Sequence, residues 1–317
     1  MRKFLTLSIL MTFSSLDGQE GIEYFQKLPK SELHLHLGGA YPLPYLLSIA
    51  SPEQANILQN SLDLIAKGIG YKEVFHVFPL IAQIVNTNEK VEHGVKALCK
   101  ELQEDGVIYA ELRTGLKDLG GGYEEYLKGV LRGIKNYPVK LFLSLQRNSS
   151  VETAKATVDL AMNYQSQGVI GIDLSGDATH GVVENILPEL LRAKAANLQL
   201  IVHMGESPEE KDQLKILEAL QPDRIGHGVH LCKEAEQWMF SHRIPLEVCL
   251  TSSVLVQMVK DYHEHPGLRY FRQGHPIVLC TDDPLIFGVS LSQELQKAHE
   301  YCGLTLEEIE QIISLKY

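Results

Sequence analysis

Eight short apolar runs recur along the chain and predict buried β-strands. They cover Ser31–Leu37, Val107–Arg113, Lys140–Gln146, Gly168–Gly176, Leu198–Glu206, Arg224–His230, Pro245–Ser253 and Pro276–Pro284. From the second run onward the starts are roughly thirty residues apart, which is the length of one strand followed by one helix. The runs are apolar without strict alternation, which indicates parallel strands covered on both faces.

The segments between these runs have the periodicity of amphipathic helices. Apolar residues recur at helical spacing in Val151–Gln167, Val182–Ala196 and Glu209–Leu220. Thr305 and Glu308 form a capping box that opens a last helix. Eight strands that alternate with helices predict an α/β fold, a (β/α)8 TIM-type barrel. We expect residues 21–317 to form this barrel as a single domain.

The connection between the first and second runs is longer than the others. It covers about seventy residues, from Gly38 to Gly106, and its pattern is mainly helical. Long inserts at a barrel mouth often cover the pocket. Phe75 and Phe78, within this insert, are therefore expected either to cover a pocket or to belong to the core.

Composition limits the possible functions. The chain of 317 residues is 44% apolar and 22% charged, which is typical of a soluble globular protein with a full core. Its formal net charge of −11 argues against a nucleic acid as the partner. No run of 18 uninterrupted apolar residues is present, so we predict no membrane-spanning helix and no membrane partner.

Residues 1–20 form a leader-like segment. Arg2 and Lys3 precede the largely apolar run Phe4–Phe13, as in a signal peptide, but no clean small-X-small cleavage site follows. The segment is interpreted as an export signal, as a leader-like first helix, or as the result of a start codon placed too early. We expect this protein to be cytoplasmic and not exported.

Candidate metal ligands lie in or near the ends of the predicted strands. His34 and His36 are two positions apart in the first run, so both imidazoles point to the same face of a strand. Residues of metal-binding type also lie toward the C-terminal ends of later runs, namely His203, Glu206, His227, Asp282 and Asp283. Barrel enzymes place their chemistry at this end of the strands.

These residue types suit a single catalytic zinc ion. His34, His36, His203 and Asp282 would supply three nitrogens and one oxygen. Bound zinc lowers the pKa of water toward neutrality, which provides a nucleophile without a covalent enzyme intermediate. The five cysteines include no Cys-X-X-Cys pair, so a thiolate site has little support. We therefore expect one Zn²⁺ per chain.

Six segments, in this order, resemble the adenosine deaminase family, and within it the adenosine deaminase-like branch linked to N6-methyl-AMP. They are Pro29–Leu37, Tyr109–Thr114, Ile172–Asp177, His203–Glu206, Pro222–Gly228 and Cys280–Pro284. The resemblance extends from about Leu28 to the C-terminus. It implies a barrel with one zinc ion at its C-terminal mouth. It also implies hydrolytic deamination of a 6-aminopurine nucleoside or nucleotide, such as adenosine or N6-methyl-AMP. Separately, we expect the protein to be a monomer.

The resemblance implies roles for individual residues. His34, His36, His203 and Asp282 are the expected zinc ligands. Glu206 is expected to protonate purine N1, and His227 to orient the attacking water and remove its proton. Protonation of N1 lets charge leave C6 as the nucleophile arrives, and general acid catalysis of this kind contributes about 10²–10⁴ in rate. Glu206 must then bind substrate in its protonated form, which requires a pKa raised by burial.

The expected substrate contacts come from four further positions and one metal ligand. Asp283 would meet N7, and the backbone N–H of Gly176 would meet N3, because glycine allows the flat base to approach closely. Asp173 and His36 are also expected among the substrate-binding residues. Arg147, just beyond the third run, is the candidate anchor for a phosphate.

The chain departs from the family pattern two positions after the second histidine. Many adenosine deaminases have an acidic residue there that reaches the sugar, whereas this chain has Gly38 followed by Gly39. Loss of a carboxylate removes repulsion against a 5′-phosphate and so favours a nucleotide. The alternative is that the two glycines only form a tight turn. Family members also usually have a further helix after the position of Ile312–Tyr317, so we expect this chain to lack that terminal helix.

Two other functions remain open. An amidohydrolase-type metallohydrolase that cleaves amides or esters often uses two metals bridged by a modified lysine, but the end of the fourth run, Asp173–Gly176, has no lysine. A catalytically inactive binding homologue would be indicated by loss of a ligand, and none is lost.

Overall fold

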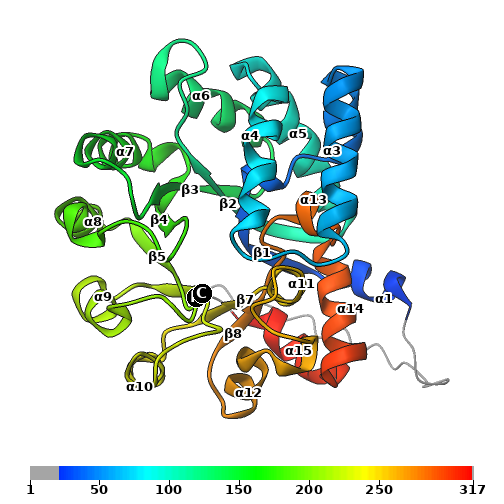
Figure 1. Cartoon of the computed structure of the whole chain (residues 1–317), viewed down its shortest axis with the longest axis vertical. Coiled ribbons are helices and arrows are strands. Elements are labelled where there is room, and N and C mark those ends of the chain that lie inside the picture. The colour runs from blue at the N-terminus through cyan, green and yellow to red at the C-terminus, as the bar shows by residue number, and fades with distance from the viewer. Residues whose placement is uncertain (1–20, 316–317) are drawn as a thin grey trace, which may run out of the picture.

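The computed structural model describes residues 21–315, so the leader-like segment lies outside the described residues. Eight strands form one sheet in the order β1 to β8, and each neighbouring pair is parallel. The strands are β1 Lys30–His36, β2 Val107–Gly115, β3 Val139–Gln146, β4 Val169–Ser175, β5 Gln199–Met204, β6 Arg224–His227, β7 Leu246–Val248 and β8 Ile277–Leu279. Helices surround the strands in Figure 1, which confirms the predicted TIM-type barrel.

The barrel closes between its first strand and the segment after its last. The N–H of His36 donates to the carbonyl of Asp282 at 2.9 Å, and the N–H of Asp282 donates to the carbonyl of His34 at 3.0 Å. This parallel bridge, centred on Leu35 and Asp282, brings the two ends of the sheet together. Two predicted metal ligands on β1 therefore lie beside a third that is almost 250 positions away along the chain.

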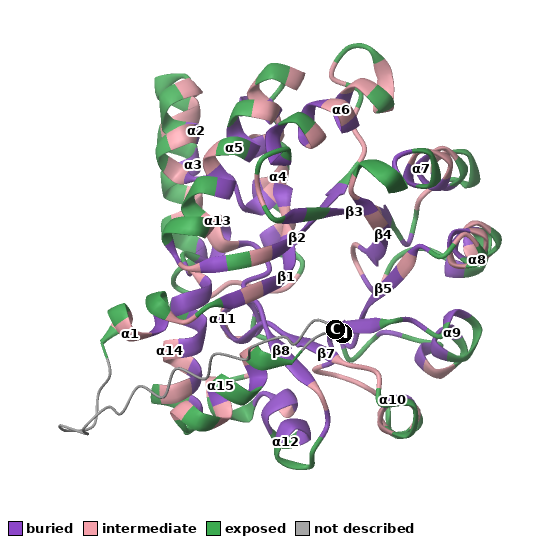
Figure 2. Ribbon diagram, turned by 180° about the vertical axis from the view of Figure 1, so that it is seen from behind, coloured by how far each residue is buried: buried purple, intermediate pink, exposed green. Residues whose placement is uncertain are grey.

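The outer helices follow the strands in sequence and present an apolar stripe to the sheet. They are α6 Gly122–Ile134, α7 Val151–Asn163, α8 Leu187–Ala195, α9 Gln213–Leu220, α10 Lys233–His242, α11 Leu250–Leu255, α12 Pro266–Arg272, α13 Pro284–Phe287, α14 Leu291–Cys302 and α15 Leu306–Ser314. In α7, for example, Ala154, Val158 and Ala161 are fully buried at helical spacing. Figure 2 shows buried strands at the centre and exposed surface on the outer helices. The predicted capping box of α15, Thr305 with Glu308, is present.

The predicted helical insert between β1 and β2 is confirmed. It contains η1 Leu37–Gly39, α2 Leu43–Ile49, α3 Pro52–Ile65, η2 Glu73–His76, α4 Val77–Ile84 and α5 Asn88–Glu104, and α1 Ile22–Lys27 precedes β1. Phe75 and Phe78 line a cavity at the barrel mouth and also pack against the core, so both roles considered for them apply. The insert therefore forms one wall of the pocket.

The structure corrects the ends of three predicted elements. The seventh run was expected to remain a strand to Ser253, but β7 ends at Val248 and α11 follows, because an apolar run alone does not distinguish a strand from a buried helix. The eighth strand likewise ends at Leu279. The helix expected from Glu209 begins at Gln213, after Asp212 takes a left-handed conformation with φ 59°. Among residues 21–315, none of the helices is long and apolar enough to span a bilayer.

Candidate active site

A cavity of about 710 Å³ opens at the C-terminal ends of the barrel strands. This main cavity is large enough for a nucleotide, since small-molecule sites typically have volumes of about 300–1,000 Å³. It is lined by most of the residues predicted from the sequence, namely His36, Arg147, Gly176, His203, Glu206, His227, Asp282 and Asp283. Residues from β1, β5, β6 and the segment after β8 thus meet in one place.

Three imidazoles converge at the floor of the main cavity. The Nε2 atoms of His34, His36 and His203 are 3.1, 3.0 and 3.1 Å apart. A four-coordinate zinc ion with bonds of 2.0–2.1 Å would separate its nitrogens by about 3.3 Å. One proton could link two of these nitrogens but not all three, so a cation satisfies the cluster best. The Asp282 carboxylate lies 3.4 Å from the Nε2 of His34 and 3.7 Å from that of His36.

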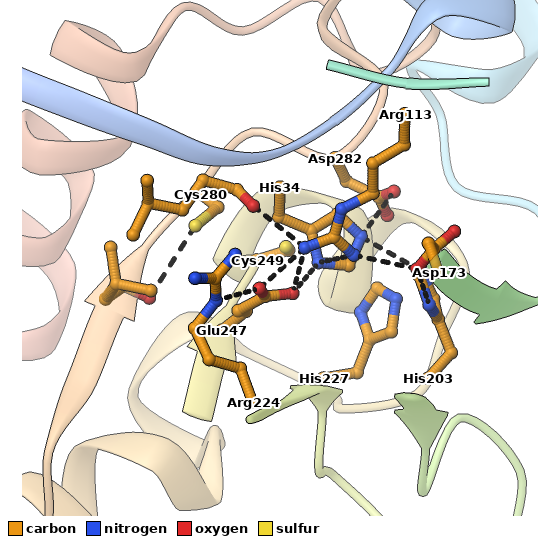
Figure 3. A network of polar contacts seen from close by, with 12 residues as sticks. His34, Arg113, Asp173, His203, Arg224, His227, Glu247, Cys249, Cys280 and Asp282 are labelled. Atoms are coloured by element: carbon orange, nitrogen blue, oxygen red, sulfur yellow. Dashed lines mark hydrogen bonds and ion pairs between the residues drawn. The ribbon is translucent and has the colours of Figure 1, made fainter. Parts of the chain in front are cut away.

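Buried carboxylates hold two of these imidazoles from behind (Figure 3). The Nδ1 of His34 is 2.7 Å from Glu247, and the Nδ1 of His203 is 3.1 Å from Asp173. A carboxylate on Nδ1 places the proton there and leaves the Nε2 lone pair free for a metal. The donor set therefore fits a divalent metal ion.

Glu247 lies inside a fully buried charge network. Its carboxylate accepts two hydrogen bonds of 2.6 Å from Arg113 and one of 2.8 Å from Arg224. Burial alone would raise the pKa of Glu247, but Arg113, His34 and Arg224 hold it well below its usual value. Glu247 thus remains ionised and carries the negative charge that fixes His34. The sequence analysis did not identify this residue, although one acidic residue in an apolar run of a parallel sheet was a signal.

Two site residues have a strained backbone. His227 has φ 65° and Asp282 has φ 67°, in the left-handed region that residues other than glycine rarely adopt. Each conformation turns a side chain into the cavity at the point where its strand has ended. Such strain costs of the order of 1–3 kcal/mol and is typical of functional sites.

Glu206 and His227 face the main cavity beside the imidazole cluster. Burial, with Glu210 and Asp282 nearby, raises the pKa of Glu206 to about 7 even though His203 acts in the opposite direction. Burial lowers the pKa of His227 well below its usual value, so its imidazole is neutral. The Oε2 of Glu206 and the Nδ1 of His227 are buried and have no hydrogen-bond partner within residues 21–315. Glu206 is therefore placed to donate a proton, and His227 to accept one.

Asp283, after β8, and Gly176, after β4, line the main cavity from strands four places apart in the barrel order. Burial and the adjacent Asp282 raise the pKa of Asp283 well above its usual value, and its Oδ1 has no hydrogen-bond partner in the described part of the chain. A Cβ at Gly39 would lie 2.0 Å from that Oδ1, so the glycine leaves the space that Asp283 occupies. Gly38 lines the cavity, which means that the double glycine both shapes a turn and opens space for a ligand.

Two residues predicted to contact substrate, Asp173 and Arg147, have partners within the protein. Asp173 is fully buried and does not line the main cavity, because its carboxylate is held by Arg113, Ser144 and His203. The Asp173 carboxylate is therefore placed to orient the His203 imidazole. Arg147 does line the cavity, but its guanidinium donates to Glu210 at 2.5 Å and to the carbonyl of His203 at 2.6 Å.

Lys117 is a cavity residue that the sequence analysis missed. Among the described residues, four cationic side chains line the main cavity, and three have carboxylate partners: Arg113, Arg147 and Lys72. Lys117 has no hydrogen bond or ion pair to any described residue, and burial lowers its pKa. It lies shortly after β2, the strand that contacts the short helix η1, which contains Gly38. The only feature of the sequence that could have identified Lys117 was its position just beyond the end of a predicted strand.

Together, the parallel barrel and the polar cluster at its C-terminal mouth define a hydrolase of the metal-dependent barrel class. The chain belongs to the adenosine deaminase family, since the family model described as adenosine deaminase matches residues 29–314. It is therefore a hydrolytic purine deaminase. The N6-methyl-AMP deaminase of Homo sapiens is 35% identical over 308 residues, with 90% of this chain and 87% of the human protein covered.

Solved structures agree with this assignment. The crystal structure of the Arabidopsis N6-mAMP deaminase MAPDA superposes with a TM-score of 0.84 at 30% identity, and covers 92% of each chain. A crystal structure of Arabidopsis ADAL complexed with GMP gives a TM-score of 0.84 at 30% identity, with 92% of this chain and 91% of that chain covered. The similarity thus extends over nearly the whole barrel.

Proposed function

We propose that this protein is a zinc-dependent deaminase that hydrolyses the C6–N bond of a 6-aminopurine nucleoside 5′-monophosphate such as N6-methyl-AMP. The convergence of three Nε2 atoms within 3.1 Å, beside a buried Glu206, carries the proposal. Three nitrogens and one carboxylate are the donor set of a catalytic zinc site. The related proteins named for N6-methyl-AMP and the relative bound to GMP support the nucleotide substrate.

In the proposed complex, the base is held at three points of its perimeter. Gly176, after β4, donates its N–H to N3, Glu206, after β5, donates to N1, and Asp283, after β8, donates to N7. Around the edge of the purine, N3 is followed by N1, C6, N7 and N9. Around the barrel, β4 is followed by β5, β6, β7 and β8, and then by β1. The two orders can therefore be matched. C6 therefore points toward β6 and β7, and the sugar on N9 toward β1 to β3.

The side chains then move the protons of the reaction. Zinc bound at this site would supply an activated water as the nucleophile. Glu206 gives its proton to N1 as the water oxygen bonds to C6, and His227 takes one proton of that water. The C6–N bond breaks when the amine nitrogen receives the proton held by His227, so ammonia or an alkylamine leaves. The remaining proton of the water returns to Glu206, which restores the starting state.

Removal of the metal is expected to abolish deamination. After dialysis against a chelator, the rate of amine release from N6-methyl-AMP should fall to background, and one equivalent of Zn²⁺ per chain should restore it. Elemental analysis of the purified protein measures the metal content directly. Full activity in metal-free protein would contradict the zinc assignment, and two metals per chain would favour the amidohydrolase alternative.

Lys117 is expected to bind the 5′-phosphate. The sugar points toward β1 to β3, where Lys117 is the one cavity cation without a carboxylate partner among the described residues. In Lys117→Ala, the ratio of kcat/KM for N6-methyl-AMP to that for N6-methyladenosine should fall about 10- to 100-fold, because a charge-assisted hydrogen bond to phosphate is lost. Steady-state kinetics on both substrates measure this ratio.

Lys72→Ala is the matched control for this experiment, since Lys72 also lines the main cavity but lies 3.7 Å from Glu209. Its substrate ratio should stay within about threefold of the wild-type ratio. An unchanged ratio in Lys117→Ala, or an equal fall in both variants, would remove Lys117 from the phosphate site. The same measurement on Arg147→Ala tests the anchor expected from the sequence.

A further inference from the structure

Glu32 lies fully buried on β1, two positions before His34. Its Oε1 accepts a hydrogen bond from the backbone N–H of His34 at 3.0 Å. Its Oε2 accepts one from the backbone N–H of Thr281 at 3.0 Å and another from the Thr281 hydroxyl at 2.7 Å. The two oxygens of one carboxylate therefore join β1 to the segment after β8.

This junction is the seam at which the barrel closes. Ladders of partnered residues join each strand from β1 to β8 to the next one. Between β1 and the segment after β8, the described residues have instead the isolated bridge of Leu35 with Asp282. The N–H groups of His34 and Thr281 lie beside this bridge, and buried N–H groups need acceptors. Glu32 supplies both acceptors, so its side chain replaces part of a strand ladder at the seam.

The seam also holds a strained residue in place. Asp282 has φ 67°, and a conformation of this kind persists only where the surrounding structure holds it. The preceding residue, Thr281, is bound by Glu32 through both its N–H and its hydroxyl. Across the seam, the same carboxylate binds the backbone of His34. Glu32 therefore holds the chain at one expected metal ligand and directly beside another.

The chemistry of this position requires a carboxylate. Glu247 and Asp173 form ion pairs with Arg113, whereas Glu32 has no cation within ion-pair distance among the residues that the structure describes. Burial of an unpaired charge is unfavourable, so Glu32 contributes more than packing. Glutamine has nearly the same shape, but it has one acceptor oxygen, and its NH2 group would face one of the two N–H groups.

We propose that Glu32 is a positioning residue of the metal site, which holds His34 and Asp282 at the spacing that one ion requires. This inference rests on the metal site of the proposed function. The Asp282 carboxylate is 3.4 Å from the Nε2 of His34, and the two groups come from opposite sides of the seam. A seam that loosens changes this distance, and an ion with fixed bond lengths then binds less tightly.

The test measures Zn²⁺ affinity by competition with a chromophoric chelator, in protein shown to be folded by circular dichroism. Glu32→Gln should bind Zn²⁺ about 10- to 100-fold more weakly than the wild type. Glu294→Gln is the matched control, because Glu294 is also fully buried and accepts the backbone N–H of a threonine, Thr251, at 3.1 Å. Its affinity should stay within about threefold of the wild-type value, whereas a role in packing alone would affect both variants equally.

Thr281→Val and Thr281→Ser form a second pair, which also tests the inference if Glu32→Gln does not fold. Valine has the shape of threonine without its hydroxyl, whereas serine keeps the hydroxyl. Thr281→Val should bind Zn²⁺ about tenfold more weakly, because a hydrogen bond to a buried carboxylate is lost, and Thr281→Ser should match the wild type. With Co²⁺ in place of Zn²⁺, the visible absorption should change in Glu32→Gln and Thr281→Val, since it depends on the geometry of the ligands.

Wild-type affinity with an unchanged Co²⁺ spectrum, in either Glu32→Gln or Thr281→Val, would overturn the inference. Equal losses of affinity in Glu32→Gln and Glu294→Gln would overturn it as well. A wild-type protein that binds no divalent metal would instead overturn the proposed function, and this inference with it.

Discussion

Replacing Glu206 by glutamine is expected to lower kcat about 10²- to 10⁴-fold while the metal content stays at one ion per chain. Glutamine has nearly the same shape and can still donate a hydrogen bond to N1, but it has no acidic proton to transfer. The Glu206 carboxyl is 8% exposed and takes no part in the contacts among His34, His36 and His203, so the expected metal ligands are left intact. Steady-state kinetics and elemental analysis of the same preparation measure both quantities.

The pH dependence of kcat/KM distinguishes loss of the acidic proton of Glu206 from a change in the shape of the site. Burial raises the pKa of Glu206 to about 7, so the protonated form predominates below that pH and is lost as the pH rises through it. The wild-type kcat/KM should therefore decline above about pH 7, and Glu206→Gln should lack this decline. Glu218→Gln, an exposed position on α9, serves as the control and should behave like the wild type. An activity of Glu206→Gln within tenfold of the wild type would mean that another group protonates the base.

Replacing Glu247 by glutamine is expected to lower metal affinity about 10- to 100-fold and to destabilise the fold by about 3–5 kcal/mol. The buried carboxylate accepts from Arg113 and Arg224 and holds the Nδ1 of His34 at 2.7 Å. A neutral amide leaves two buried guanidinium groups without their shared counter-charge. It also no longer fixes the His34 proton on Nδ1, which weakens His34 as a ligand through Nε2.

Metal-binding titrations and denaturant unfolding of the metal-free protein separate the two effects. The loss of unfolding free energy should appear without metal, because the ion pairs with the arginines do not depend on it. Glu247→Asp keeps the charge on a shorter side chain and should recover stability more fully than metal affinity, since His34 needs the longer reach. Wild-type metal affinity in Glu247→Gln would show that His34 is held in place by other contacts.

The sequence predicted the fold because periodicity is a local property. Eight apolar runs with helical patterns between them indicated parallel strands and a barrel, and the structure confirms this arrangement. The strand ends were less certain. Leu250–Leu255 is a helix within a run predicted as a strand, because buried helices and buried strands are both apolar.

Most of the residues that line the cavity could also be predicted from the sequence. His34 and His36 share a face because the side chains of a strand alternate with a period of two. The positions of His203, Glu206, His227 and Asp282 near strand ends placed them at one mouth of the barrel. These inferences required only the order of the strands and the end at which each polar residue lies.

Which charged groups act on one another became clear only from the folded chain. Glu247 reaches His34 from a strand more than two hundred positions away, and Asp173 turns toward His203 and away from the cavity. Arg147 was expected to meet phosphate but is bound to Glu210, while Lys117 is left without a partner among the described residues. Pairing of charges and the raised pKa of Glu206 depend on distance and burial in three dimensions. The barrel sets both when it closes, so a local pattern of residues could not reveal them.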